Sequence, residues 1–345
     1  MSHLGSFRLS RRGVLAAGGA LGLGALVTAC GGEDGGSDGA DSGSGSGEDS
    51  WSFTDDRGEK VTADARPERV VAFTGTAAAL HDFGLDDELV GVFGETKQKN
   101  GEPDPTAGEL DVDKVEVIGN VWGEFSVEKY AALKPDLLVT HMYDPDAYWY
   151  VPDESKDKIL ELAPSVLITT GRVPMTEPIK RYAELAESLG ADLGAKKVTD
   201  AKARFEAAAE TLRRTAKSAG LRVLAASGAA DTFYVSNPEI SGDLMYFKKL
   251  GVDIVVPDNT DEGGYFESLS WENADKYEAD LIILDNRTTS LQPKDLTSKP
   301  SWSDLPAVKA SQVATWDAVP RFSYLGAAPL LENLAKALQD AKKLG

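Results

Sequence analysis

Aromatic residues gather on a segment that has neither strand nor helix periodicity. The stretch "THMYDPDAYWYVP" contains Tyr143, Tyr148, Trp149 and Tyr150. Such side chains combine apolar area with a hydrogen-bonding edge, which suits a large, partly apolar ligand. For any single one of them, local packing within the loop is the alternative. As a group they favour a binding cleft, to which other parts of the chain would add Trp122, Tyr234, Tyr265, Phe266, Trp316 and Tyr324.

Three arginines stand just past the ends of expected strands. Arg172 follows "SVLITT", Arg287 follows "LIILDN", and Arg321 lies in "AVPRFSY". A guanidinium group there can donate several hydrogen bonds to ligand oxygen atoms. A surface salt bridge is the alternative for each. We expect the three arginines to supply the polar part of the same cleft.

Histidine and cysteine are too scarce for a transition-metal site. Beyond the first 30 residues the chain has only His81 and His141 and no cysteine, so a three-histidine or histidine/cysteine site cannot form. His81 lies inside a helix pattern and is expected to be structural. His141 ends the strand "DLLVT", where it could contact a ligand, or it could be a hydrogen-bonded loop residue. The chain has no Walker A loop, no Gly-x-Ser-x-Gly and no His-Glu-x-x-His, so a secreted hydrolase is only a distant alternative.

Two pairs of similar segments predict how these residues are positioned. "SVEKYAALKPDLLVT" and "SWENADKYEADLIIL" both read as a short helix followed by a buried strand, with Ser126 and Ser270 as helix N-caps. "VVAFTGTAAALHDFGLDDELVGV" and "FYVSNPEISGDLMYFKKLGVDIVV" both read as strand, turn, helix and strand. The repeats predict an α/β fold with two Rossmann-like lobes, each with a mainly parallel sheet. The first lobe carries an additional polar insertion, "ETKQKNGEPDPTAGELDVDK".

The segment between the two lobes is predicted to be helical. It is rich in Ala, Glu, Lys and Arg, and Gly190 and Gly220 are suitable C-cap residues. We expect a helix near 176–189 and a longer one near 194–218 that joins the lobes. The predicted division is an N-terminal lobe at 51–175, linking helices at 176–219 and a C-terminal lobe at 220–345, with the ligand cleft between the lobes.

The start of the chain has the layout of an export signal. Residues 1–29 have a basic start, an apolar middle and a small-residue end, and they contain Arg11 and Arg12 in a pattern similar to the twin-arginine export motif. "VTAC" resembles a lipobox, which would make Cys30 the lipidated first residue. Residues 30–50 then form a disordered Gly, Ser and acidic tether. We expect a protein anchored by lipid on the extracellular face of the cell membrane.

Charge and composition exclude two classes of protein. The chain carries 36 basic and 56 acidic side chains, a net charge of −20, which repels nucleic acid phosphates. The hydrophobic fraction is 42%, typical of globular proteins, and the only long apolar stretch lies in the leader, so several membrane spans are excluded.

From about Trp51 to Gly345 the chain resembles the substrate-binding lipoproteins of ABC importers for ferric siderophores, haem and cobalamin. The shared segments are "RVVAFTGT", "LHDFGLDDELVGV", "SVEKYAALKPDLLVT", "LGVDIVV" and the ending "PSWSDLPAVKASQVATWDAVPRFSYLGAAPLLENLAKAL". The chain is most similar to actinobacterial hydroxamate siderophore receptors. The resemblance implies a monomeric, non-enzymatic receptor that hands a ferric siderophore to an ABC permease and its ATPase. It also implies no cofactor and no direct metal ligand, because the siderophore holds the iron; haem or cobalamin is the alternative ligand.

One expected feature of that family is missing. Its members usually carry a surface glutamate on the first helix of each lobe, which docks on arginines of the permease. Ala78 stands at this place in the first lobe, so either other carboxylates, such as Asp82 or Asp243, dock on the permease, or the permease differs. Acidic residues near the three arginines suit a neutral or cationic complex better than a triply anionic catecholate, and this favours a hydroxamate siderophore.

Overall fold

The N-terminal lobe is built on a five-stranded sheet in which every neighbouring pair is parallel. The order is β5-β4-β3-β6-β7. Strands β4 and β5 are added on one side of β3 and strands β6 and β7 on the other, so the switch point of the sheet lies between β3 and β6. A separate antiparallel hairpin precedes the sheet. The strands are β1 (Trp51–Thr54), β2 (Lys60–Ala63), β3 (Val70–Phe73), β4 (Leu89–Phe93), β5 (Glu116–Gly119), β6 (Leu137–Met142) and β7 (Ser165–Thr169).

The sheet of the C-terminal lobe is mixed, with three parallel strand pairs and two antiparallel ones. The order is β11-β9-β8-β12-β13, and β10 also pairs with β8. The pairs β8–β12, β12–β13 and β8–β10 are parallel, whereas β8–β9 and β9–β11 are antiparallel. The strands are β8 (Arg222–Gly228), β9 (Thr232–Ser236), β10 (Asp253–Ile254), β11 (Phe266–Ser270), β12 (Leu281–Asp285) and β13 (Val313–Trp316).

A short turn explains the antiparallel part of this sheet. Only residues 229–231 separate β8 from β9, and so short a connection can only return the chain antiparallel. The second repeat is therefore less regular than the first. Ser126 caps its helix by accepting a hydrogen bond from Lys129 N, but Ser270 makes no side-chain cap and precedes only a 3-10 turn.

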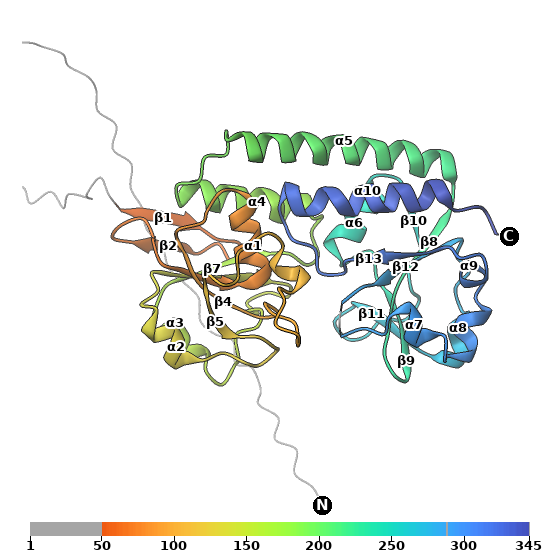
Figure 1. Cartoon of the computed structure of the whole chain (residues 1–345), viewed down its shortest axis with the longest axis horizontal. Helices are drawn as coiled ribbons and strands as arrows, with labels where there is room; N and C mark the ends of the chain where they lie inside the picture. The colour runs from red at the N-terminus through yellow and green to blue at the C-terminus, as the bar shows by residue number, and fades with distance from the viewer. Residues whose placement is uncertain (1–49, 288, 345) are drawn as a thin grey trace, which may run out of the picture. The chain divides into compact units, whose positions relative to one another are not determined.

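The helices lie around both sheets (Figure 1). The expected linking helices are α4, which ends at Ser188, and α5, which ends at Ala219 before Gly220 in the left-handed conformation. Helix α10 lies beside α5, and Arg204 joins them through two hydrogen bonds to Glu332. The helices are α1 (Thr74–Asp82), α2 (Val127–Ala132), α3 (Lys156–Leu160), α4 (Thr176–Ser188), α5 (Lys196–Ala219), α6 (Gly242–Lys249), α7 (Pro293–Leu296), α8 (Pro300–Asp304), α9 (Pro306–Lys309) and α10 (Tyr324–Asp340), with 3-10 turns at Pro105–Ala107 and Trp271–Asn273.

Alternation along the strands divides the core into three parts. Val70 and Ala72 of β3 face a core shared by both lobes, together with Val223 and Ala225 of β8. The intervening residues of each strand face a smaller core that belongs to one lobe alone. This period of two is what a strand covered on both faces requires. The shared core continues through α4, α5 and α10, so the two lobes are packed together along one side.

The computed structural model describes residues 50–287 and 289–344, which belong to one compact unit. The expected export signal, Cys30 and nearly all of the expected tether lie outside the described residues. Within the described part, none of the helices has the length and apolar character needed to cross a membrane.

Candidate functional site

A cavity of about 350 Å³ lies between the two lobes. Tyr143 and Thr170 line it from the N-terminal lobe, just past the ends of β6 and β7. Ser227, Asp285 and Trp316 line it from the C-terminal lobe, at the ends of β8, β12 and β13. Ligands of open α/β sheets bind outside the carboxyl ends of the strands, and here two such edges face the same space.

Two smaller cavities adjoin this one. A cavity of about 70 Å³ shares Trp149, Arg287 and Val319 with the large cavity. A third, of about 160 Å³, shares Phe73 and Asp317 with the small one and reaches His141. Because neighbouring cavities have walls in common, we treat the three as one site and call it the cleft.

Aromatic rings form much of the cleft wall. The ring centroids of Tyr143 and Trp149 are 4.6 Å apart, and those of Trp149 and Tyr150 are 5.5 Å apart. Trp122 covers both Trp149 and Tyr150 from outside and is 64% exposed. Tyr265 lines the opposite wall, in the C-terminal lobe. An aromatic wall of this kind offers large contact area at little cost in conformational entropy.

The three predicted arginines all pair with carboxylates. Arg287 Nη2 lies 2.7 Å from Asp285 Oδ2, and the pair lines the large cavity. Arg321 Nε lies 2.7 Å from Asp82 Oδ2, and Arg321 also lines the third cavity.

Arg172 links the two lobes at the edge of the cleft. Its Nη2 donates to Asp144 Oδ1 in the N-terminal lobe at 2.9 Å and to Gly263 O in the C-terminal lobe at 2.8 Å. Arg172 does not line the described cavities. Its guanidinium lies over the ring of Tyr265, so it supports the wall that Tyr265 forms.

Two buried hydroxyls in the large cavity have no protein partner. Thr170 is 1% exposed and Ser236 is fully buried, and neither hydroxyl oxygen makes a hydrogen bond among the described residues. Buried polar atoms are nearly always hydrogen-bonded, because leaving one unsatisfied costs about 1–3 kcal/mol. A polar ligand group would satisfy these hydroxyls.

Burial raises the pKa of two acidic residues in the cleft. Asp243 accepts a hydrogen bond from Trp316 Nε1 at 2.6 Å, yet burial raises its pKa to about 7. Burial likewise raises the pKa of Asp317 to about 6. Both groups lose favourable hydration of the charged form, which shifts each equilibrium toward the neutral acid.

His141 reaches the third cavity of the cleft, but its side chain is almost completely enclosed. It is 1% exposed, its Nδ1 lies 3.1 Å from the Tyr182 hydroxyl, and its ring packs against Phe73 and Phe322. Burial lowers its pKa to about 3, so it is neutral at physiological pH. In the part of the chain that the structure describes, no group of histidine, cysteine, aspartate and glutamate side chains could hold a metal ion.

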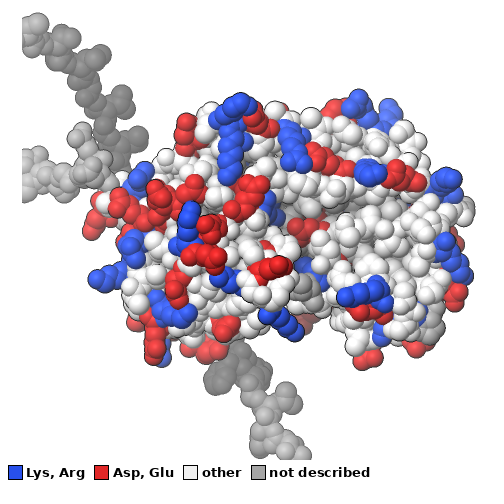
Figure 2. Space-filling view, in the orientation of Figure 1, with Lys and Arg blue, Asp and Glu red and all other residues white. Residues whose placement is uncertain are grey.

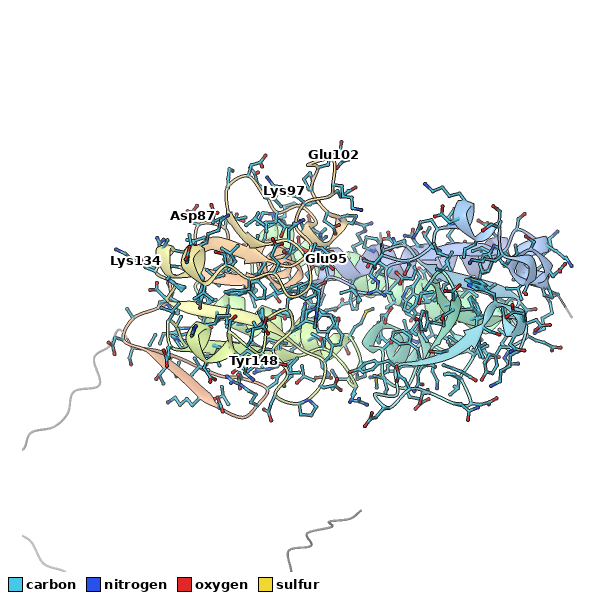
Figure 3. The ribbon with its side chains drawn as sticks, turned by 90° about the horizontal axis from the view of Figure 1, so that it is seen from below. Asp87, Glu95, Lys97, Glu102, Lys134 and Tyr148 are labelled. Carbon is cyan, nitrogen blue, oxygen red and sulfur yellow. The ribbon has the colours of Figure 1, made fainter. Side chains whose placement is uncertain are left out.

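Three other predicted site residues lie away from the cavities. Tyr148, labelled on the N-terminal lobe in Figure 3, does not line the cavities. It contacts Arg57 and Ser165, at the start of β7 rather than its end. Tyr324, the first residue of α10, packs between Phe83 and Phe205. Tyr234 packs on Phe266, which does line the large cavity.

The polar insertion of the first lobe contributes residues that the sequence did not single out. The loop after β4 carries Glu95, Asp104 and Thr106, and these line the small cavity. Phe73 and Tyr150 complete the same wall. The signal in the sequence was the length of the insertion, since a long loop at a strand end reaches the ligand side of such a sheet.

The expected docking carboxylates are not on the surface. Asp82 is 3% exposed and pairs with Arg321 and Ser323, while Asp243 is 1% exposed and bonded to Trp316. Ala78 is completely buried, so its position in α1 has no room for a surface glutamate either. The expectation that Asp82 or Asp243 could dock on a permease is therefore wrong, because both carboxylates are used inside the protein. Other acidic side chains do crowd the N-terminal lobe on the face shown in Figure 2.

Comparison with known proteins gives consistent matches. Residues 70–320 match the sequence profile of the family described as periplasmic binding protein. The chain is 54% identical to DesE, a ferric-siderophore receptor protein from Streptomyces coelicolor, with a TM-score of 0.82 over 86% of this chain and 100% of that one. PiuA, an iron-uptake ABC transporter substrate-binding protein from Streptococcus pneumoniae, is 18% identical with a TM-score of 0.65 over 83% and 98% of the two chains. No curated protein matches.

Proposed function

Because this chain belongs to the periplasmic binding protein family, we propose that it captures a ferric siderophore in the cleft and delivers it unchanged to an ABC permease. Membership of the family makes the chain a binding protein and not an enzyme. The cleft fits this role because it is enclosed by two lobes, walled by aromatic rings and provided with unsatisfied hydroxyls.

The observation that carries the proposal is the 54% identity to the ferric-siderophore receptor over its full length. The TM-score of 0.82 shows that the two chains share the fold over this length. Solved structures with lower identity to this chain support the fold alone.

The charge of the cleft supports a hydroxamate complex over a catecholate one. A ferric tris-hydroxamate is neutral or carries the charge of its tail, whereas a ferric tris-catecholate is triply anionic. Arg287 is the only basic residue among the described ones that line the large cavity, and it is already paired with Asp285. Of the other acidic residues there, Asp144 pairs with Arg172 and Asp243 is partly neutral, so the described lining offers no unpaired positive charge to an anionic ligand. Bringing three negative charges into this environment would be strongly unfavourable.

Haem and cobalamin remain the alternative ligands, and His141 argues against axial ligation. Its Nδ1 faces Tyr182, and its ring is enclosed by Phe73 and Phe322. Ligation of a haem iron would require this packed ring to move.

The proposal places the protein outside the cell membrane, attached through lipid on Cys30. The twin-arginine pattern and the lipobox support export and anchoring, and the acidic Gly/Ser segment would serve as the tether. Two or more acyl chains provide stable anchoring, because each buried CH₂ group contributes about 0.8 kcal/mol.

Fluorescence titration tests the proposed function. Ferric desferrioxamine should quench the emission of Trp149 and Trp122, whereas ferric enterobactin, haem and cobalamin should not at equal concentrations. Trp149→Ala should weaken binding of ferric desferrioxamine by about 2–4 kcal/mol, since a stacked aromatic anchor is lost. Trp51→Phe is the matched control, because Trp51 lies on β1 and bonds to Ser188, outside the cleft. Quenching by haem or cobalamin alone would contradict the proposal.

A further inference from the structure

The cleft carries an excess of negative charge that its basic residues do not balance. Six acidic side chains among the described residues line the three cavities, against two lining arginines, Arg287 and Arg321. Both guanidinium groups are already engaged, one with Asp285 and one with Asp82. Arg172 pairs with one of the six, Asp144, from the edge of the cleft, and burial keeps Asp243 partly neutral. The carboxylates that line the cleft are Glu95, Asp104, Asp144, Asp243, Asp285 and Asp317.

Three of these acidic residues line the small cavity without forming an ion pair with another described residue. Arg287 lines the same cavity, but its guanidinium is paired with Asp285. Glu95 accepts a hydrogen bond from the Tyr150 hydroxyl, and Asp104 accepts one from Thr106 N at 3.0 Å. Asp317 is bonded to the backbone of Val319. None of the three forms an ion pair within the described part of the chain.

The large cavity shows separately that the cleft is built for a ligand. The hydroxyls of Thr170 and Ser236 are buried there without partners, which is costly unless a ligand satisfies them. At about 350 Å³ this cavity can hold the bulky part of a ligand, while the adjoining cavity of about 70 Å³ can hold only a slender extension. Trp149 stands in the wall of both cavities, so a ligand lying along Trp149 enters both.

The small cavity also has the composition of a cation site. Its lining includes the aromatic rings of Phe73, Trp149 and Tyr150 in addition to the three acidic residues. The π face of such a ring attracts a cation. Burial raises the pKa of Asp317 to about 6, which indicates that its negative charge is poorly solvated and would be stabilised by a cation beside it.

Building on the proposed function, we propose that the small cavity binds a positively charged tail of the ferric siderophore, so that the protein selects complexes with a free ammonium group over neutral ones. The iron-chelating body would occupy the large cavity. The tail would pass Trp149 and lie among Glu95, Asp104 and Asp317. The large cavity would therefore contact the iron chelate, and the small cavity would recognise the charge of the tail.

The test compares two ligands that share one iron centre. Ferrioxamine B has a free ammonium group, and its N-acetyl derivative is neutral. We expect the protein to bind ferrioxamine B at least about tenfold more tightly, because an ion pair in a partly buried site is worth more than 1.4 kcal/mol. An N-trimethylated ferrioxamine B keeps the charge and adds bulk similar to that of the acetyl group, so it should bind nearer to ferrioxamine B than the acetyl form does.

Variants locate the preference within the cleft. Glu95→Gln keeps an acceptor for the Tyr150 hydroxyl, so it should fold, and it should lower the ratio of the two affinities by about tenfold. Asp317→Asn should act in the same direction. Glu102→Gln is the matched control: it removes the same charge from the same loop, but Glu102 is exposed at the loop's outer end (Figure 3), so the ratio should stay constant.

The outcomes separate this inference from the proposed function. Equal affinities of the wild-type protein for ferrioxamine B and its acetyl form would overturn the charge preference and leave the siderophore function standing. A preference that Glu95→Gln and Asp317→Asn leave unchanged would show that the small cavity is not where the tail binds. Failure of every ferric hydroxamate to bind would overturn the proposed function itself, and the inference with it.

Discussion

Asp243→Asn should change how the stability of the protein depends on pH. Asp243 is 1% exposed and sits at the first turn of α6, where burial raises its pKa from 3.8 to about 7 despite the hydrogen bond from Trp316. The pKa of this carboxyl group is higher in the folded protein than in the unfolded chain. Between the two values the unfolded chain releases the proton and the folded protein keeps it, so the unfolding free energy falls as the pH rises from the unfolded pKa through the folded pKa. The wild-type protein must therefore lose stability through this residue between about pH 4 and pH 7.

The size of the effect follows from the two pKa values. With 3.8 in the unfolded chain and about 7 in the fold, ionisation of Asp243 removes about 2–3 kcal/mol of unfolding free energy between pH 5 and pH 8. Asparagine cannot ionise, so the variant should lack this loss. Any fixed cost of the amide, whose NH₂ group would face the backbone N–H of Leu244, is the same at both pH values and cancels from the comparison.

Urea denaturation at pH 5 and pH 8 measures the effect. The unfolding free energy of Asp243→Asn minus that of the wild type should be about 2–3 kcal/mol larger at pH 8 than at pH 5. Asp231→Asn, at an exposed turn between β8 and β9, is the control and should give a gap that does not move. Parallel pH dependence of Asp243→Asn and the wild type would refute the argument that burial governs this carboxyl group.

Three further predictions concern other parts of the chain. Asp82→Ala should lower the unfolding free energy by about 3 kcal/mol or more in urea denaturation, because it leaves Arg321 partly buried and unpaired; a change below about 1 kcal/mol would contradict this. Gly108→Ala should lower the melting temperature more than Gly58→Ala does: both positions have positive φ, but a Cβ at Gly108 would lie 1.3 Å from Arg321 Nη1, whereas Gly58 has open space. Cys30→Ala should leave the affinity for the ferric siderophore unchanged while moving the protein from the membrane fraction to the soluble fraction, or blocking its maturation; retention of mature protein in membranes would count against lipidation.

The fold was largely predictable because its repeats are local. A capping residue followed by an apolar run indicates a helix-to-strand unit in the sequence, as in the segment from Ser126 to β6. Strand direction is different, since it depends on the length of a connection and on where the partner lies. The antiparallel pairing of β8 and β9 therefore appears only in the structure, where a three-residue turn enforces it.

Cleft residues that follow a strand end could be predicted from the sequence. For residues in loops, the side of the loop on which each side chain lies could not be predicted. Arg287 and Trp316 stand at strand ends, and both line the large cavity. Tyr148 and Trp149 are neighbours in one aromatic loop, yet only Trp149 faces the cleft, because successive side chains leave the backbone on different sides. Glu95 belongs to a loop whose polar composition is equally typical of a solvent-exposed surface, so composition alone could not assign it to the cleft.

The core shared by both lobes has a mechanical consequence. Because α5 and α10 pack against both sheets as one body, opening the lobes widely would expose apolar surface that the fold keeps dry. Small-angle scattering should thus give nearly the same radius of gyration with and without ligand. The heat-capacity change of binding should reflect the cleft surface alone. A permease that touches both lobes would then recognise the loaded protein by the ligand exposed between them rather than by their spacing.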